Sequence, residues 1–268
     1  MHIVERGIGN PLVVIPGLQG RWEYVRQTVD ALSQSFRVIT FSLGDERTAR
    51  WRYDPSRGMD SFADQVGAAL DECGVDRAAI CGVSFGGLVA LRFAARERDR
   101  VSALVMVSTP GPGWHLKPRH DLYTRVPRLF GPLFFAESPW RLRRELAATL
   151  PGAGDRLRFA RQQLRTAIEA PLSVSRMAAR ARLVATHDRR ADGASLSCPT
   201  LVVHGDPALD HVVDAGGTLD YVKLIPGARS AALQNTGHLG SLIKPYEFST
   251  IVRGFLSTAL RGNHDSAA

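Results

Sequence analysis

The sequence predicts an α/β protein in which a mostly parallel, twisted sheet carries helices on both faces. Three observations lead to this prediction. Apolar runs of strand length alternate along the chain with amphipathic stretches of helix length. A glycine-rich turn at 82–87 joins one apolar run directly to a helical pattern. The alternation stops near residue 110 and resumes near 196, which indicates one sheet domain with an insertion.

The individual elements follow from local composition. Strands are expected where short apolar runs are bounded by turn residues, near 2–6, 11–16, 36–42, 78–83, 101–108, 199–204 and 229–234. Helices are expected where apolar residues recur every three or four positions, at 22–34, 60–73, 85–97, 214–222 and 245–260. Pro245 suits the first position of the last helix, because its missing N–H has no partner there in any case.

The inserted segment has a different character. Between residues 110 and 195 no strand pattern is present; Pro and Gly cluster up to residue 139, and helical patterns follow near 138–149, 154–169 and 171–185. We therefore expect a core of residues 1–109 and 196–262 and a helical cap of residues 110–195. A cap at the carboxyl edge of the sheet would enclose a substrate. The polar residues 263–268 are expected to form a disordered tail.

The turn Gly82-Val83-Ser84-Phe85-Gly86, followed by Gly87, has the form of a nucleophile elbow. A serine on a sharp strand-to-helix turn needs very small neighbours two residues to either side, because a larger Cβ would collide with the flanking strand and helix. Strain in such a turn exposes the serine hydroxyl. Ser84 is therefore the candidate nucleophile.

A serine nucleophile needs a base and a group that orients the base. His238, in Thr236-Gly237-His238, follows the last expected strand and is the candidate base. The orienting acid is expected after strand 199–204, where Asp206 and Asp210 stand. The chain order serine, aspartate, histidine is the order found in α/β-hydrolases and differs from the orders of chymotrypsin and subtilisin.

With these motifs the chain resembles the α/β-hydrolase superfamily over nearly its whole length. Four segments carry the resemblance: the strand and oxyanion loop at 11–22, the elbow, the acid loop at 203–213, and the histidine loop with the closing helix at 236–248. The resemblance implies that the backbone N–H groups of Leu18 and Phe85 form the oxyanion hole. Pro16 replaces a histidine that is usual in the family and removes its own N–H, which leaves the Leu18 donor untouched.

The identity of the acid is open between two aspartates. In the resembling family the acid commonly lies about three residues after the glycine that ends the strand, where this chain has Ala208. We favour Asp210, because Asp210-His211-Val212-Val213 is similar to the Asp-x-x-Val segment of the family. Asp206 directly follows the strand, where a carboxylate can cap a turn, and it is the alternative.

The chain carries a net charge of +8, and its basic excess lies in the cap. Residues 110–195 hold 16 Lys and Arg against 7 Asp and Glu. One interpretation is that cap arginines attract or hold an anionic substrate, for example Arg119, Arg125, Arg128, Arg143 and Arg144. The other is that arginines such as Arg156, Arg158, Arg161 and Arg165 simply form solvated helix faces. Nucleic acid is not an expected partner, because the aromatic residues do not alternate with the basic ones.

Several classes of site and location are not expected. No Gly-x-Gly-x-x-Gly or Walker motif is present, and no histidine pair has the spacing of a helical zinc site, so we expect neither cofactor nor metal. Three cysteines without Cys-x-x-Cys spacing favour reduced thiols and a cytoplasmic location. The N-terminus does not resemble a signal peptide, and no apolar segment approaches the length of a membrane span.

The sequence therefore predicts a serine hydrolase that cleaves a carboxylic ester or lactone of a small molecule through an acyl-enzyme. Ser84, His238 and Asp210 are the expected catalytic residues. One alternative is a hydrolase of carbon–carbon bonds in a diketone-like acid, for which a basic cap would be suitable. An alternative of another class is a ligand receptor or binding protein that keeps the hydrolase fold with little turnover.

Overall fold

The computed structural model describes residues 1–265 and contains a seven-stranded sheet in the order β1-β3-β2-β4-β5-β6-β7. Among the described strands only β1 runs antiparallel to its neighbour, β3; the other pairs are parallel. The predicted α/β fold class is confirmed. Each strand lies within two residues of its expected bounds: β1 (Ile3–Arg6), β2 (Pro11–Ile15), β3 (Arg37–Phe41), β4 (Ala78–Val83), β5 (Val101–Val107), β6 (Thr200–His204) and β7 (Arg229–Ala232).

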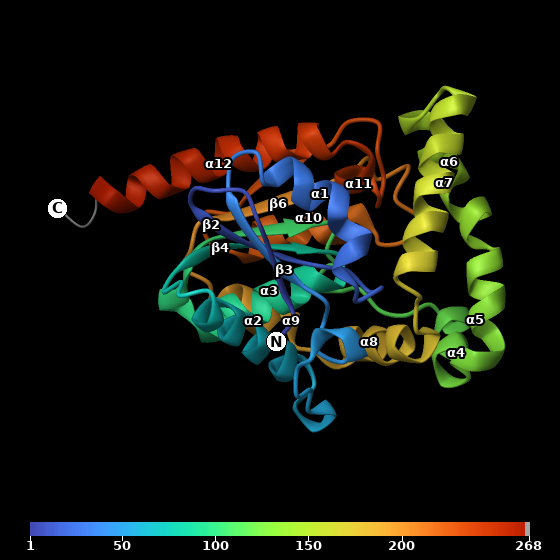
Figure 1. Cartoon of the computed structure of the whole chain (residues 1–268), viewed down its shortest axis with the longest axis horizontal. Coiled ribbons are helices and arrows are strands. Elements are labelled where there is room, and N and C mark those ends of the chain that lie inside the picture. The colour runs from blue at the N-terminus through green and yellow to red at the C-terminus, as the bar shows by residue number, and fades with distance from the viewer. Residues whose placement is uncertain (266–268) are drawn as a thin grey trace.

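The central strands are apolar because helices cover both sheet faces. Every residue of β4 and of β5 is buried, which explains why these strands read as continuous apolar runs rather than alternating patterns. Helices α1 (Arg26–Leu32) and α12 (Pro245–Asp265) cover one face, and α2 (Met59–Glu72), α3 (Phe85–Arg96) and α10 (Ala215–Leu224) cover the other (Figure 1).

Each face of the sheet therefore has its own apolar core. On the α1 side, Val29 packs in one cluster with Phe248 and Val252 of α12. On the α3 side, the rings of Phe62 and Phe85 meet edge to face with centroids 5.6 Å apart. Apolar packing therefore covers the sheet on both faces.

Two helix bounds differ from expectation. The helix expected at 22–34 is a 3-10 turn, Trp22–Val25, followed by α1. Helix α12 continues to Asp265, past Gly262, with no proline after residue 260 to end it. The expected tail at 263–268 therefore begins inside this helix, and residues 266–268 lie outside the described part of the chain.

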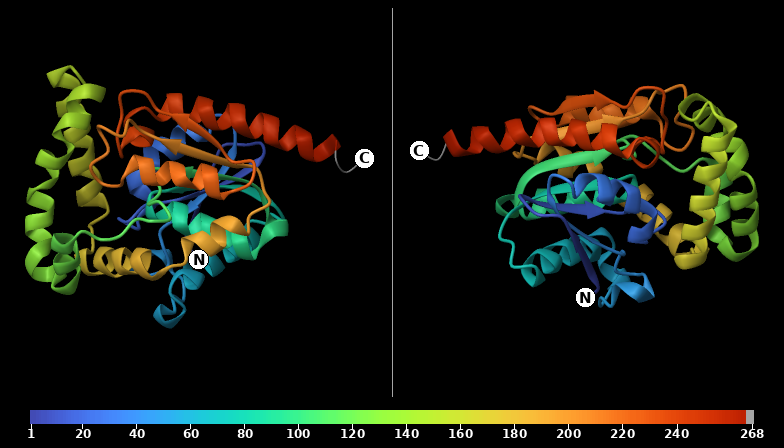
Figure 2. Two further views of the ribbon diagram at one scale, coloured as in Figure 1. Left: turned by 180° about the vertical axis from the view of Figure 1, so that it is seen from behind. Right: turned by 45° about the horizontal axis from the view of Figure 1, so that its top comes forward.

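Residues 110–195, called the cap below, contain helices and no strand within the described chain. Most of the cap stands as a column of helices beside the sheet, and α8 leads back to the core (Figure 2). Two of its helices lie in the segment where Pro and Gly cluster and for which no helix was expected. A proline occupies the first position of each, where a missing N–H costs nothing, and Pro132 lies inside the second. The cap helices are α4 (Pro118–Arg125), α5 (Pro127–Ala136), α6 (Ser138–Thr149), α7 (Ala153–Glu169), α8 (Val174–Thr186) and α9 (Arg189–Ala194).

A last short helix, α11 (Gly240–Ile243), precedes α12 and follows the loop that carries His238. Among residues 1–265 no helix has both the length and the apolar character needed to cross a membrane.

Candidate active site

Ser84 lies between the end of β4 and the start of α3 with a strained backbone, φ 54° and ψ −116°. A positive φ is uncommon for a residue with a side chain. The surrounding structure holds it in place: the Ser84 N–H donates to the Val107 carbonyl at 2.7 Å, and the Ser84 carbonyl accepts from the Gly87 N–H at 2.9 Å. The strain is therefore stabilised by the neighbouring strand β5 and by the first turn of α3.

The glycines of the elbow have no room for a side chain. A Cβ at Gly82 would lie 2.2 Å from the Gly86 carbonyl oxygen, and a Cβ at Gly86 would lie 2.3 Å from the Ile15 carbonyl oxygen. Both obstacles are backbone atoms, which cannot move aside cheaply. This crowding is the steric requirement that the sequence motif expresses.

Three loops bring a serine, a histidine and an aspartate into one hydrogen-bonded line. His238 Nε2 lies 3.2 Å from Ser84 Oγ, and His238 Nδ1 lies 3.3 Å from Asp210 Oδ2. Asp210 is buried, and its other oxygen, Oδ1, accepts from the N–H groups of Val212 at 3.0 Å and Val213 at 2.9 Å. One carboxylate oxygen is thus held by backbone donors while the other faces the imidazole.

Asp206, the alternative acid, points elsewhere. Its side chain is exposed, and its Oδ1 accepts from the Ala208 N–H at 2.8 Å, which closes a turn. Its own N–H donates to the Thr236 carbonyl at 2.7 Å, so its backbone joins the acid loop to the histidine loop. The structure brings Asp210, not Asp206, to His238.

His238 and Asp210 shift each other's pKa so that each favours the charged form of the other. Burial alone would lower the pKa of His238, but the charge and the hydrogen bond of Asp210, together with the charge of Glu145, outweigh burial and raise that pKa above its ordinary value. Burial would raise the pKa of Asp210, yet the nearby imidazole and the two backbone donors hold it below its usual range. An ionised Asp210 can only accept, so the Nδ1 of His238 carries the proton and Nε2 is free to accept one from Ser84.

The resemblance implied that the backbone N–H groups of Leu18 and Phe85 form an oxyanion hole. A Cβ built on Gly17 would be 3.5 Å from Ser84 Cβ, so the loop that carries Leu18 lies against the elbow. Phe85 is the first residue of α3, where an N–H has no acceptor within its own helix. Among the described residues neither the Leu18 N–H nor the Phe85 N–H donates to a protein group. Both N–H groups are therefore left without a protein acceptor within residues 1–265.

Two buried charged residues of the cap reach this site and were not foreseen from the sequence. Glu145 of α6 accepts from the N–H groups of Gly237 and Leu239, on either side of His238. Arg180 of α8 donates to the Leu18 carbonyl. Each side chain is 1% exposed. The partners are 92 to 162 residues apart in sequence, so no local pattern could identify them.

Three of the five exposed cap arginines singled out as possible anion ligands have other partners. Arg119 pairs with Glu137 and Arg125 with Asp121, both at the surface. The guanidinium of Arg143 stacks on the ring of Trp140, which is itself 71% exposed. These contacts favour the interpretation of solvated helix faces over that of a substrate-binding cluster.

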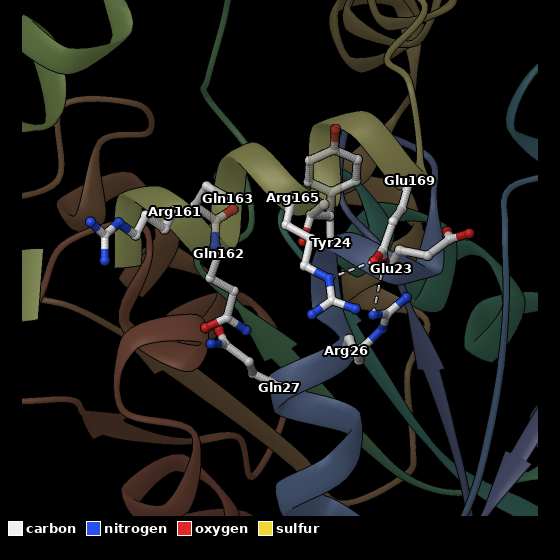
Figure 3. A pocket seen from close by; sticks show the side chains of 10 residues that line it. Glu23, Tyr24, Arg26, Gln27, Arg161, Gln162, Gln163, Arg165 and Glu169 are labelled. Atoms are coloured by element: carbon white, nitrogen blue, oxygen red, sulfur yellow. Dashed lines mark hydrogen bonds and ion pairs between the residues drawn. The ribbon is translucent and has the colours of Figure 1, made fainter. Parts of the chain in front are cut away.

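A polar groove of about 430 Å³ separates α7 from the beginning of α1 (Figure 3). Glu169 lies in it and accepts from Arg26 of the core at 3.1 Å and from Arg165 of α7 at 2.7 Å. No triad residue lines this groove. Within residues 1–265, no group of three or more His, Cys, Asp or Glu side chains is arranged to hold a metal ion.

Comparison with known proteins gives a consistent picture. The family described as alpha/beta hydrolase fold matches residues 10–245. The chain is 32% identical to polyketide synthase ThaQ of Burkholderia thailandensis over 97% of this chain but spans only 12% of that protein. It is 28% identical to pimeloyl-[acyl-carrier protein] methyl ester esterase of Nitrosomonas europaea, covering 92% of this chain and 96% of that one.

The fold also matches solved structures. The crystal structure of the enol-lactonase from Burkholderia xenovorans LB400 superposes with a TM-score of 0.76 at 19% identity, covering 96% of each chain. An identity this low shows similarity of fold alone. The superfamily is shown by the family match over most of the sequence. The chain belongs to the alpha/beta hydrolase fold family and is a hydrolase.

Proposed function

We propose that the protein hydrolyses a carboxylic ester or lactone of a small molecule through an acyl-enzyme on Ser84. The single observation that carries this proposal is the hydrogen-bonded line from Ser84 Oγ through His238 to Asp210, beside two unengaged backbone N–H groups. A nucleophile, its base, an orienting acid and oxyanion donors are the parts that acyl transfer needs.

The geometry supports the following sequence of steps. His238 Nε2 accepts the proton of Ser84 as Oγ attacks the substrate carbonyl carbon, and the N–H groups of Leu18 and Phe85 stabilise the oxyanion. The imidazolium, held by Asp210, then donates its proton to the leaving alcohol oxygen and the acyl-enzyme forms. His238 next removes a proton from water, which attacks the acyl carbon, and returns a proton to Ser84 as the acid departs.

The choice of ester or lactone rests on similarity as well as geometry. The relative from Nitrosomonas europaea that matches over nearly its full length is named for a methyl ester, and the enol-lactonase shares the fold. In this proposal residues 1–109 and 196–262 form the catalytic core, and the cap limits which substrates reach Ser84. The free cysteines, Cys73, Cys81 and Cys198, fit the cytoplasmic location that we expect.

The test is labelling with a fluorophosphonate probe, which reacts with activated serines. Wild type should label and Ser84→Ala should not, whereas Ser56→Ala, which removes an exposed serine far along the chain from the elbow, should label normally. Hydrolysis of p-nitrophenyl esters of increasing chain length then maps the acyl preference. Turnover of a diketone-like acid without ester turnover would instead support carbon–carbon bond cleavage. Folded wild type that neither labels nor turns over would contradict the proposal and favour a receptor.

A further inference from the structure

The cap contributes a buried carboxyl group to the loop that carries His238. Glu145 lies on α6 and is 1% exposed. Its Oε1 accepts from the Gly237 N–H at 2.8 Å and from the Leu239 N–H at 2.6 Å, the two backbone donors that flank His238. The fit is close, because a Cβ at Gly237 would lie 2.9 Å from Glu145 Cδ.

A second contact from the same helix holds the same loop. Thr149, one turn after Glu145, donates through Oγ1 to the Asn235 carbonyl at 2.7 Å. Asn235 has a left-handed backbone, φ 55°, so the loop bends sharply just before the histidine. Helix α6 therefore contacts the histidine loop both before and after the imidazole. The loop has a conformation that the cap helps to define.

We propose that Glu145 is a positioning residue for His238: from the cap, its carboxylate fixes the backbone on both sides of the base. This inference rests on the proposed function, in which His238 is the base. Hydrogen bonds from two N–H groups to one carboxylate oxygen are charge-assisted and stronger than neutral ones. They hold the imidazole at the distances from Ser84 and Asp210 that proton transfer requires. Docking of α6 against the core is thus a condition for an assembled triad.

The charge of Glu145 also acts on the imidazole. Burial raises the pKa of Glu145, and the two backbone donors and His238 oppose that rise. The groups that face it are His238 and Asp210. Its second oxygen, Oε2, has no protein partner among the described residues. In its ionised form Glu145 adds to the effect of Asp210 and favours the protonated form of His238.

Two substitutions separate the roles of the hydrogen bonds and the charge. In Glu145→Gln the amide oxygen can replace Oε1 as the acceptor, and the amide nitrogen takes the place of the unpartnered Oε2. Glu145→Ala removes the acceptor. Glu169→Gln makes the same chemical change elsewhere in the cap, at a carboxylate that binds Arg26 and Arg165, and serves as the matched control. The readout is the rate of fluorophosphonate labelling at Ser84, measured across the pH range in which histidine titrates.

We expect Glu145→Gln to label within about threefold of wild type at high pH, since its backbone bonds survive. Its labelling rate should begin to rise at lower pH than that of wild type, because the negative charge of Glu145, which favours the protonated form of His238, has been removed. Glu145→Ala should label at least about tenfold more slowly, because a misplaced base loses rate steeply. The control should match wild type in both respects.

The outcomes distinguish this inference from the proposed function. If wild type fails to label at Ser84, the hydrolytic role itself is refuted. If wild type labels and folded Glu145→Ala labels as fast as wild type, the positioning role alone is refuted. An unchanged pH profile in Glu145→Gln would refute the action of the Glu145 charge on His238. Should Glu145→Ala not fold, this second measurement still tests whether the carboxylate acts on the base, since a purely structural contact would not move the pH profile.

Discussion

Arg180 Nη1 donates to the carbonyl oxygen of Leu18 at 2.8 Å, which joins cap helix α8 to the loop expected to supply an oxyanion donor. The N–H and C=O of one residue point in different directions, so a fixed carbonyl restricts how the loop can present its N–H groups. The same guanidinium pairs with Asp45 at 2.6 Å and with Glu46 at 2.5 Å. Gly20 leaves room for it, because a Cβ there would lie 2.2 Å from Nη1.

We expect Arg180→Lys to impair both stability and rate. An ammonium group is a point charge and cannot reproduce the forked contacts to Asp45, Glu46 and Leu18. Breaking a buried ion pair typically costs about 3–5 kcal/mol, and a lysine that keeps one contact should lose part of that. The free energy of unfolding from urea titration and the rate of fluorophosphonate labelling should both fall.

Arg176→Lys provides the comparison. Arg176 lies one turn earlier on α8 and pairs with Glu46 at 2.8 Å, and its side chain is 30% exposed. Its replacement should change stability by about 1 kcal/mol or less and leave the labelling rate unchanged. Equal labelling rates in Arg180→Lys and Arg176→Lys would show that the Leu18 contact has no influence on the reactive serine.

The two aspartates of the acid loop should respond very differently to the same substitution. Asp210→Asn replaces the acceptor of the His238 Nδ1 proton with a group that can hold the wrong tautomer, and a change of this kind costs about 10⁴-fold in kcat in serine proteases. Asp206→Asn keeps a side-chain oxygen for the Ala208 N–H and should alter kcat by less than about twofold. Steady-state hydrolysis of a p-nitrophenyl ester measures both; a larger loss in Asp206→Asn would reverse the assignment.

The raised pKa of His238 predicts the pH at which activity begins to rise. The base must be neutral to accept the Ser84 proton, so kcat/KM should rise with pH through the pKa of His238 in the free enzyme. Because Asp210 raises that pKa, the midpoint should lie above the ordinary histidine value of 6.5. In Asp210→Asn the remaining activity should have its midpoint at lower pH. A wild-type midpoint below 6.5 would mean that burial, not the carboxylate, dominates.

The same shift has a consequence for stability. A histidine whose pKa is higher in the folded than in the unfolded protein stabilises the fold at pH values below the unfolded pKa. This contribution is lost as the pH rises through the folded pKa. Urea unfolding of wild type and of His238→Gln, compared on both sides of pH 6.5, isolates the contribution. The difference in unfolding free energy between the two proteins should be more favourable to wild type at the lower pH; no change with pH would show that the folded pKa is not raised.

The sequence predicts the features of the site that depend on neighbouring residues, and it does not predict the contacts between residues far apart in the chain. The strands were predictable because buried parallel strands are continuous apolar runs, and the elbow because backbone crowding demands glycine at fixed spacing around Ser84. The roles of Glu145 and Arg180 could not be predicted, because in the sequence a buried charged residue on a helix cannot be told apart from a solvent-exposed one. Helices α4 and α5 were missed because proline marks both a break and a helix start.

The crowding at the elbow yields a final prediction about Gly86. In Gly86→Ala the new methyl group would meet the carbonyl oxygens of Ile15 at 2.3 Å and Pro16 at 2.5 Å. Either the start of α3 or the end of β2 must then shift, which we expect to cost about 2–3 kcal/mol of unfolding free energy and to suppress labelling of Ser84. Gly154→Ala is the matched control: no atom lies within 4 Å of a Cβ there, in the first turn of α7. That change should be neutral or stabilising by up to about 1 kcal/mol, because alanine favours helix over glycine. A Gly86→Ala protein as stable and as reactive as Gly154→Ala would mean that the elbow is not strained in solution.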